Sequence, residues 1–153
     1  MYLYSILVSR MLKPIVPLAK SSFVLRLFSA TVAAGFPSPA DDYVEKGLSL
    51  DELLIKHPSS TYLARACGDS MRGCGILDGD ILIIDRSITA KSGDIVIAAL
   101  NGELTCKFLD LKQSQLLSAN SKYPPIKLNG EAELLIEGVV VSSIRVHQPC
   151  MLS

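Results

Sequence analysis

An Asn-Gly pair at positions 101–102 constrains the fold of this chain more than any other feature of its sequence. The pair stands between two runs of strand-forming residues, 95–100 and 103–109. Asn-Gly favours a two-residue type I′ turn, because both residues of that turn must adopt positive φ. The sequence therefore predicts a tight hairpin in which the numbers of opposed residues sum to 203, so that Lys107 lies across from Val96.

Short strand patterns recur on both sides of this hairpin, and several follow a glycine turn. They cover residues 61–66, 81–84, 116–117, 134–136 and 138–146, the last of which has the composition of a buried closing strand. One helix is expected to begin after Ser49, a capping residue with Glu52 three positions on, and to end at His57-Pro58. The pattern as a whole predicts a mainly β fold with one short helix.

Composition limits the chain to one domain with, at most, an arm. Hydrophobic residues make up 49% of the 153 residues, which is ample for a core. The net charge is zero and so gives no indication of nucleic-acid binding, but residues 1–35 carry a net charge of +4 and residues 36–153 carry −4. A basic arm can dock on an acidic body; ordinary solvation of the charges is the alternative.

Neither the cysteines nor the acidic residues have the spacing of a metal site. The cysteines contain no Cys-x-x-Cys pair, the histidines lie far apart, and the aspartates that follow the glycine turns lack calcium-loop spacing, which favours turn formation. We therefore expect no metal, no other cofactor and free thiols in the cytoplasm. The residues concerned are Cys67, Cys74, Cys106, Cys150, His57, His147, Asp78, Asp80 and Asp85.

The first 34 residues partly imitate a targeting signal. Apolar runs at 2–8 and 23–28 precede small residues at 30–34, as in a signal peptide or an acid-poor transit peptide. Basic residues and prolines interrupt these runs, and none reaches the ~20 residues of a membrane span. We expect no secretion and no membrane span, and we expect residues 1–10 to be an extension from an over-called start codon, with the chain starting at Met11.

A serine and a lysine carry the chemistry that the sequence suggests. Ser70 follows the turn Gly68-Asp69, and Lys107 lies in the hairpin 37 residues later. Serine needs a base, and a lysine can act as one if burial lowers its pKa of about 10.4 by ~3 units, which corresponds to about 4 kcal/mol. Taken separately, the Ser70 segment is also compatible with a plain turn, and a lone lysine in a strand with a solvated or edge residue.

These residues, together with an Ala-Gly bond upstream, resemble the self-cleaving LexA/UmuD family, and its UmuD-like members most closely. The likeness runs from about Gly35 to about Val146. The segments that carry it are 34–45, 68–71, 78–80, 93–99 and Lys107. The resemblance implies a peptidase domain of twisted antiparallel sheets in residues 41–153, which also dimerises, and a flexible arm in residues 1–40 that contains the cleavage site.

The resemblance also implies a mechanism. Ser70 attacks the carbonyl of Ala34 and so cuts the Ala34–Gly35 bond. Lys107 takes the serine proton as general base and returns it to the amine of Gly35 as general acid. The backbone N–H groups of Asp69 and Ser70 form the oxyanion hole.

Two neighbouring side chains are expected to lack a chemical role. We expect Met71 to line the cleft and His57 to be a helix-end residue, since no Ser-His-Asp motif supports it as a base.

Partners follow from the same resemblance. It implies a homodimer that acts in the SOS response to DNA damage, is stimulated to cleave by the RecA nucleoprotein filament, and in shortened form serves a UmuC-type translesion polymerase, with a sliding clamp as a further candidate contact. Only 34 residues precede Gly35, too few for a DNA-binding domain with its linker, so no sequence-specific DNA binding is expected.

Three alternatives remain open at this stage. The chain can be an interaction module in which self-cleavage is secondary, or a truncated LexA-like partner of repressors without a DNA-binding domain. It can also be a membrane protease of the signal-peptidase type, which uses the same serine-lysine chemistry but has an uninterrupted apolar anchor.

Overall fold

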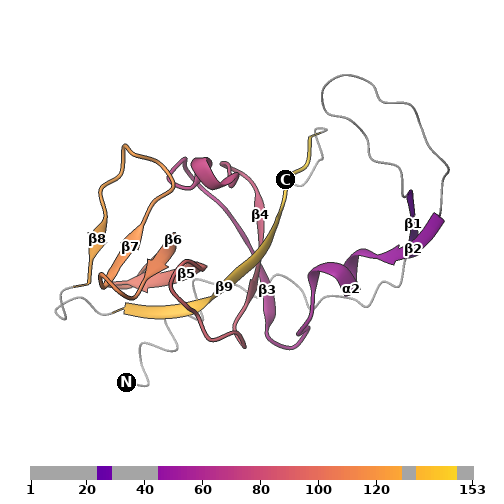
Figure 1. Cartoon of the computed structure of the whole chain (residues 1–153), viewed down its shortest axis with the longest axis horizontal. Helices are drawn as coiled ribbons and strands as arrows, with labels where there is room; N and C mark the ends of the chain where they lie inside the picture. The colour runs from indigo at the N-terminus through magenta and orange to yellow at the C-terminus, as the bar shows by residue number, and fades with distance from the viewer. Residues whose placement is uncertain (1–23, 29–44, 129–133, 148–153) are drawn as a thin grey trace. The chain divides into compact units, whose positions relative to one another are not determined.

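Figure 1 shows a computed structural model of the chain, in which residues 24–28, 45–128 and 134–147 are described. They divide between two compact units, one within residues 18–56 and one that includes residues 57–153. The expected arm boundary after residue 40, the expected start at Met11 and the Ala34–Gly35 bond all lie outside the described residues.

The smaller unit contains two strands and the only α-helix of the described residues. Strands β1 (Val24–Phe28) and β2 (Glu45–Ser49) pair antiparallel. Helix α2 (Leu50–Leu54) begins as predicted after Ser49, whose hydroxyl accepts a hydrogen bond from the Glu52 N–H at 3.4 Å. It ends earlier than expected, because Ile55 already has extended backbone angles and donates its N–H to the carbonyl of Asp51.

The larger unit is a seven-stranded antiparallel sheet in the order β3-β4-β9-β5-β6-β7-β8. Its strands are β3 (Thr61–Arg65), β4 (Ile81–Asp85), β5 (Ile95–Leu100), β6 (Glu103–Asp110), β7 (Gln115–Leu117), β8 (Ile126–Lys127) and β9 (Leu134–Ile144). One turn of 3-10 helix, η1 (Arg72–Cys74), lies between β3 and β4. Over the residues that the structure describes, the predicted mainly β fold with antiparallel sheets and one short α-helix is confirmed.

The predicted hairpin is present with the predicted register. Asn101 and Gly102 both have positive φ, 49° and 84°, as a type I′ turn requires. Strands β5 and β6 flank the turn, and Val96 is paired with Lys107. The turn therefore sets the register that places Lys107 opposite Val96.

Strand β9 differs from the prediction of two separate strands. It is one strand that lies between β4 and β5, and it stays continuous because Glu137 and Val141 are accommodated as bulges where the register shifts. Gly138 lies where the backbone of β9 approaches β4, and a Cβ there would lie 2.6 Å from Cγ2 of Ile84. The expectation of a buried closing strand is wrong for the last residues of β9, since Val141 is 42% exposed.

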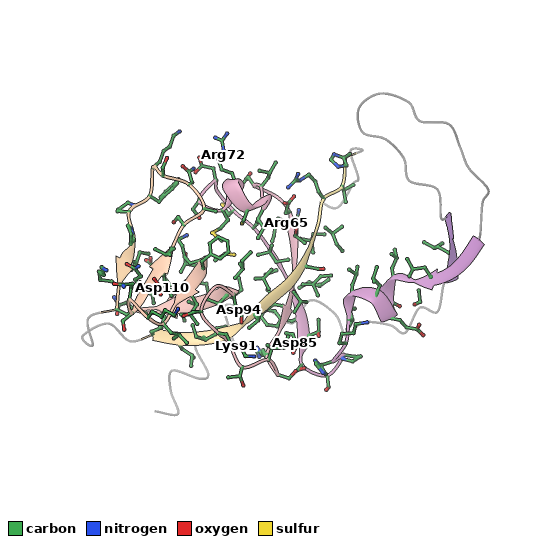
Figure 2. All side chains as sticks on the ribbon, viewed as in Figure 1. Arg65, Arg72, Asp85, Lys91, Asp94 and Asp110 are labelled. Atoms are coloured by element: carbon green, nitrogen blue, oxygen red, sulfur yellow. The ribbon has the colours of Figure 1, made fainter. Side chains whose placement is uncertain are left out.

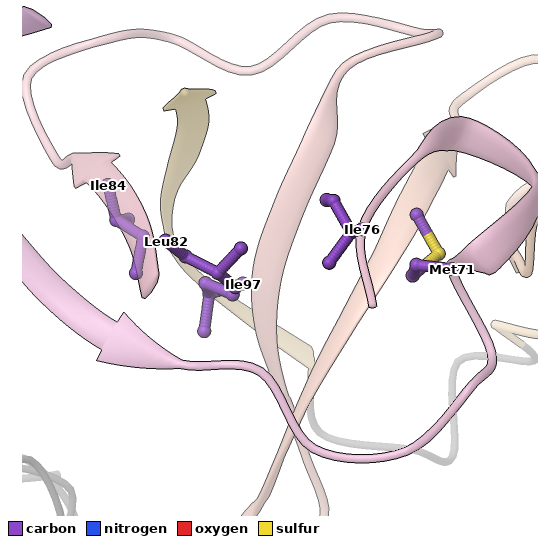
Figure 3. Close-up of a cluster of buried hydrophobic side chains, with 5 residues drawn as sticks. All are labelled: Met71, Ile76, Leu82, Ile84 and Ile97. Carbon is purple, nitrogen blue, oxygen red and sulfur yellow. The ribbon is translucent and has the colours of Figure 1, made fainter. Parts of the chain in front are cut away.

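The core forms two clusters because successive residues of each strand point to opposite faces. Figure 3 shows the first, in which Met71 and Ile76 from the segment between β3 and β4 join three strand residues. The first cluster is Met71, Ile76, Leu82, Ile84 and Ile97, and the second is Val96, Ala98, Leu109, Leu116 and Val139. The first cluster therefore anchors the segment that contains Ser70 to the sheet.

Among the described residues, no helix has the length and apolar character that crossing a membrane requires.

Candidate active site

Ser70 lies in a segment, residues 66–80, that leaves the sheet after β3 and returns to it at β4; we call it the nucleophile loop. Two backbone hydrogen bonds join the two ends of this loop. The Ala66 N–H donates to the carbonyl of Asp80 at 2.8 Å, and the Gly79 N–H donates to the carbonyl of Ala66 at 2.9 Å. The Gly68 N–H donates to Oδ1 of Asp78 at 2.7 Å. The Asp-Gly-Asp sequence at 78–80 thus closes the loop at its base.

An ion pair between the buried carboxylate of Asp80 and the exposed Arg145 fixes the same loop to the chain at the end of β9. The guanidinium of Arg145 donates to both carboxylate oxygens of Asp80, at 2.8 and 2.7 Å, and to the carbonyl of Gly75 at 2.6 Å. Asp80 is only 3% exposed and also accepts from the Leu77 N–H. The hydrogen bond from Arg145 holds the pKa of Asp80 below its usual value and outweighs burial, which acts in the opposite direction. No local sequence pattern indicates this pair, whose members are 65 positions apart.

Ser70 and Lys107 form a direct hydrogen bond. Nζ of Lys107 lies 2.8 Å from Oγ of Ser70 and 3.0 Å from the carbonyl oxygen of Cys106. Lys107 is 7% exposed, and Val96, its partner across the hairpin, is fully buried. The nucleophile loop supplies one member of the pair and β6 the other.

No carboxylate among the described residues forms an ion pair with Lys107 that would stabilise its protonated form. Figure 2 shows Asp85, Lys91, Asp94 and Asp110 at the opposite end of the larger unit from Arg72, which lies in the nucleophile loop. The carboxylates of these aspartates accept hydrogen bonds within turns. That of Asp94, for example, accepts from the backbone N–H of Lys91 at 2.8 Å.

Burial lowers the pKa of Lys107, because the charged ammonium loses hydration that the surrounding side chains do not replace. The neighbouring thiol of Cys106 does not reverse this shift at neutral pH. Burial raises the pKa of Cys106 to about 11, so the thiol stays uncharged and offers the lysine no anion. A neutral amine beside a serine hydroxyl is the arrangement that a serine-lysine mechanism needs.

A second loop, residues 118–125, forms hydrogen bonds with the nucleophile loop. Nδ2 of Asn120 donates to the carbonyl oxygen of Asp69 at 3.0 Å and to its Oδ2 at 3.1 Å. The hydroxyl of Tyr123 donates to Oδ1 of Asp69 at 2.5 Å, and the Gly73 N–H donates to the carbonyl of Ala119 at 2.8 Å. Sequence reasoning identified residues 120–125 only as a loop, and an Asn-Ser-Lys-Tyr-Pro-Pro sequence carries no signal for more.

The structure thus brings Ser70, Lys107 and Asp69 together, while Ala34 and Gly35 lie outside the described residues. Met71 does not line a cleft as expected; it is 3% exposed and packs in the first core cluster.

His57 takes no part in this constellation. Its Nδ1 lies 2.6 Å from Oδ2 of Asp85, and the hydroxyl of Ser60 donates to Oδ1 of the same carboxylate at 3.1 Å. Burial would raise the pKa of Asp85, but hydrogen bonds from Ser87 and His57 outweigh it and hold that pKa well below its usual range. The Ser60 hydroxyl donates to the Asp85 carboxylate and, at 3.2 Å, to the backbone carbonyl of His57, and none of its described hydrogen bonds reaches the imidazole, so this is not the geometry of a catalytic triad.

Comparison with known proteins agrees with this geometry. Residues 26–141 match the family model described as Peptidase S24-like. The chain is 39% identical over 132 residues to "Protein ImpA" of Salmonella typhimurium, covering 86% of this chain and 91% of that protein. It is 41% identical over 122 residues to "Protein MucA" of the same species, covering 78% and 84%. It is 43% identical over 116 residues to the LexA repressor of Alcanivorax borkumensis, covering 74% of this chain and 56% of the repressor.

The family match covers most of the chain, including the nucleophile loop and β6. The chain therefore belongs to the Peptidase S24-like family and is a self-cleaving serine peptidase of the LexA/UmuD type, with a UmuD-type function in SOS mutagenesis.

Proposed function

We propose that this peptidase cuts its own Ala34–Gly35 bond with Ser70 as nucleophile and Lys107 as general base. The observation that carries the proposal is the 2.8 Å hydrogen bond between Nζ of Lys107 and Oγ of Ser70, made by a lysine that is 7% exposed. A base whose nitrogen lies about 2.6–3.2 Å from the oxygen that carries the proton meets the geometric condition for general-base catalysis.

The reaction has two stages. Oγ of Ser70 bonds to the carbonyl carbon of Ala34 while neutral Lys107 accepts the hydroxyl proton; the protonated lysine then gives this proton to the nitrogen of Gly35, and the Ala34–Gly35 bond breaks. Water next attacks the ester between Ala34 and Ser70, again with Lys107 as base, which frees the serine. The backbone N–H groups of Asp69 and Ser70 stabilise the oxyanion of both stages.

Intact-mass analysis of the full chain after incubation at alkaline pH tests this proposal. We expect two fragments whose masses place the new amino terminus at Gly35, and we expect Ser70→Ala and Lys107→Ala to yield neither. Rapid production of the same fragments by the purified Ser70→Ala protein would exclude the mechanism.

We further propose that the RecA nucleoprotein filament stimulates this cleavage, and that the shortened chain then acts as a homodimer with a UmuC-type translesion polymerase in the cytoplasm. A lowered lysine pKa supports regulation by a partner, because a filament that selects the neutral, docked state raises the rate without adding any chemistry. Similarity to "Protein MucA" and "Protein ImpA" over most of their length supports the UmuD-like assignment.

Two measurements test the partner proposal. Adding RecA filaments to the purified chain at pH 7 should produce the Gly35 fragment, and omission of single-stranded DNA should prevent it. Copurification should recover a UmuC-type polymerase, with a sliding clamp as an additional candidate, from cells that carry the shortened chain. An unchanged rate with assembled filaments would exclude RecA stimulation.

The similarity to a LexA repressor favours one alternative, in which the chain pairs with full-length repressors instead of a polymerase. The two proposals predict different partners in the same copurification. Recovery of a repressor and no polymerase would support the alternative and leave the cleavage chemistry unaffected.

A further inference from the structure

The peptide bond between Asp69 and Ser70 is held in one orientation by two donors. Its carbonyl oxygen accepts from Nδ2 of Asn120 at 3.0 Å and from the backbone N–H of Arg72 at 3.2 Å. The peptide unit is planar and trans, so its N–H points opposite to its C=O. Fixing the Asp69 oxygen toward Asn120 therefore fixes the direction of the Ser70 N–H.

The side chain of Asp69 strengthens this hold. Its Oδ2 accepts from the same Asn120 nitrogen at 3.1 Å, and its Oδ1 accepts from the hydroxyl of Tyr123. The hydrogen bond from Tyr123 lowers the pKa of Asp69, and its own backbone N–H acts in the same direction. Asp69 is therefore a carboxylate at neutral and alkaline pH, and it accepts hydrogen bonds from both residues.

The Ser70 N–H itself has no acceptor in hydrogen-bond geometry within the part of the chain that the structure describes. Of the two expected oxyanion donors, the Ser70 N–H is the one whose direction Asn120 sets, because it belongs to the same peptide unit as the Asp69 carbonyl.

Close packing on the other side of Ser70 limits the freedom of the loop. The Gly73 N–H donates to the carbonyl of Ala119 at 2.8 Å, and a Cβ on Gly73 would lie 2.2 Å from that oxygen. The second loop therefore contacts the nucleophile loop both before and after the serine.

We propose that Asn120 is a positioning residue for the oxyanion hole: by binding both the carbonyl and the carboxylate of Asp69, it aims the Ser70 N–H at the oxygen of the attacked carbonyl. This proposal rests on the proposed function and adds to it a role for the second loop. Loss of one oxyanion donor lowers rates by about 10²–10³-fold, so misdirecting one is expected to cost about 10–100-fold.

Two substitutions at the same position distinguish positioning from packing. Asn120→Ala removes the donors and leaves space, whereas Asn120→Asp keeps the shape but places a carboxylate against the carbonyl and carboxylate oxygens of Asp69. Positioning by hydrogen bonds predicts a plateau rate of self-cleavage at alkaline pH that falls about tenfold in Asn120→Ala and further in Asn120→Asp. A packing role predicts the opposite order, because Asp fills the space and Ala does not.

The pH profile supplies a second readout. Asn120 does not contact Lys107 in the described hydrogen bonds, so the midpoint of the profile should stay at the wild-type value while the plateau falls. Ser121→Ala, an exposed neighbour in the same loop, is the matched control and should keep the wild-type plateau. A plateau for Asn120→Ala within twofold of wild type, or a higher plateau for Asn120→Asp than for Asn120→Ala, would overturn the proposal.

Folding and the underlying function are checked separately. Should Asn120→Ala fail to fold, as seen by circular dichroism, Tyr123→Phe replaces it; a severalfold lower plateau with an unchanged midpoint is then expected, and an unchanged plateau overturns the proposal. If the wild-type chain yields no Gly35 fragment, it is the proposed function that fails. Phosphonylation of Ser70 in the full chain by a fluorophosphonate probe then tests the positioning alone: slower reaction of Asn120→Ala than of Ser121→Ala supports it, and equal rates overturn it.

Discussion

The side-chain nitrogen of Lys107 lies 2.8 Å from the hydroxyl oxygen of Ser70, although 37 positions separate the two residues in the chain. The lysine is buried at 7% exposure, and its pKa is lowered by the loss of hydration. The proton on this nitrogen therefore decides whether the serine has a base. Control of cleavage by pH, and by any partner that selects the neutral form, follows from this one contact.

The rate of self-cleavage should follow the neutral fraction of Lys107. Below the pKa of the lysine the rate rises about tenfold per pH unit, and it levels off before pH 10.5, the ordinary lysine value, because burial lowers the pKa. Fragment formation measured from pH 6 to 11 gives this curve. A rate that keeps rising through pH 10.5 would point to attack by hydroxide and contradict the assignment.

Lys107→Arg is the matched control for that experiment. It keeps the positive charge in the same strand, but a guanidinium does not lose its proton in this range. We expect no fragments from this variant at any pH up to 11.

The same burial should make Lys107 destabilising. In a Ser70→Ala background, which prevents cleavage, Lys107→Met should raise the free energy of unfolding at pH 7 by about 1 kcal/mol, a small value because solvent screens part of the penalty. The unfolded lysine binds a proton more tightly than the folded one, so stability of the Lys107 protein rises with pH between the lowered pKa and 10.5. The gap between the two proteins should therefore close as pH approaches 10.5.

Urea unfolding at several pH values measures this gap. Lys127→Met, on the exposed side of β8, is the control and should show no such pH dependence. A gap that widens with pH would mean that Lys107 is stabilised as a cation, against the mechanism.

Local chemistry accounts for what the sequence could predict. The Asn-Gly turn sets the register of β5 and β6, and that register alone places Lys107 opposite buried Val96. The cap at Ser49 likewise depends on residues three apart. Features of this kind are recoverable because the interacting groups are close in sequence.

The remaining features depend on strand order, which no local pattern encodes. Arg145 meets Asp80 across 65 positions because β9 enters the sheet beside β4. Asn120 meets Asp69 across 51 positions. The single β9 strand with two bulges was predicted as two strands, because the register shift at Glu137 arises only when β9 pairs with β5.

The tight approach of β9 to β4 predicts a specific intolerance at Gly138. A methyl group there would lie 2.6 Å from Cγ2 of Ile84, which is fully buried and cannot move away. Gly138→Ala should lower the free energy of unfolding by about 3 kcal/mol through overpacking. Gly79→Ala is the comparison: its Cβ would meet nothing within 4 Å, so only its φ of +85° opposes the change, at about 1 kcal/mol. Equal losses in urea unfolding would show that β9 can shift.

The Asp80–Arg145 pair should couple stability to cleavage. Arg145→Ala leaves a carboxylate that is 3% exposed without its charged partner, so the urea midpoint at pH 7 should fall clearly, and cleavage should slow because the base of the nucleophile loop loosens. Adding Asp80→Asn should recover part of the stability, since the buried charge is gone.

The contribution of the Asp80–Arg145 pair to stability should depend on pH in a defined direction. Arg145 lowers the pKa of Asp80, so the pair stabilises the fold above the unfolded value of 3.8, and that contribution is lost as pH falls through the lowered pKa. The difference in stability between wild type and Arg145→Ala should therefore shrink below pH 4. Arg72→Ala, an exposed arginine of the same loop, should change stability by less than about 0.5 kcal/mol at any pH. A wild-type advantage that persists unchanged at pH 2 would mean that Arg145 acts through packing and its bond to Gly75 rather than through the charge of Asp80.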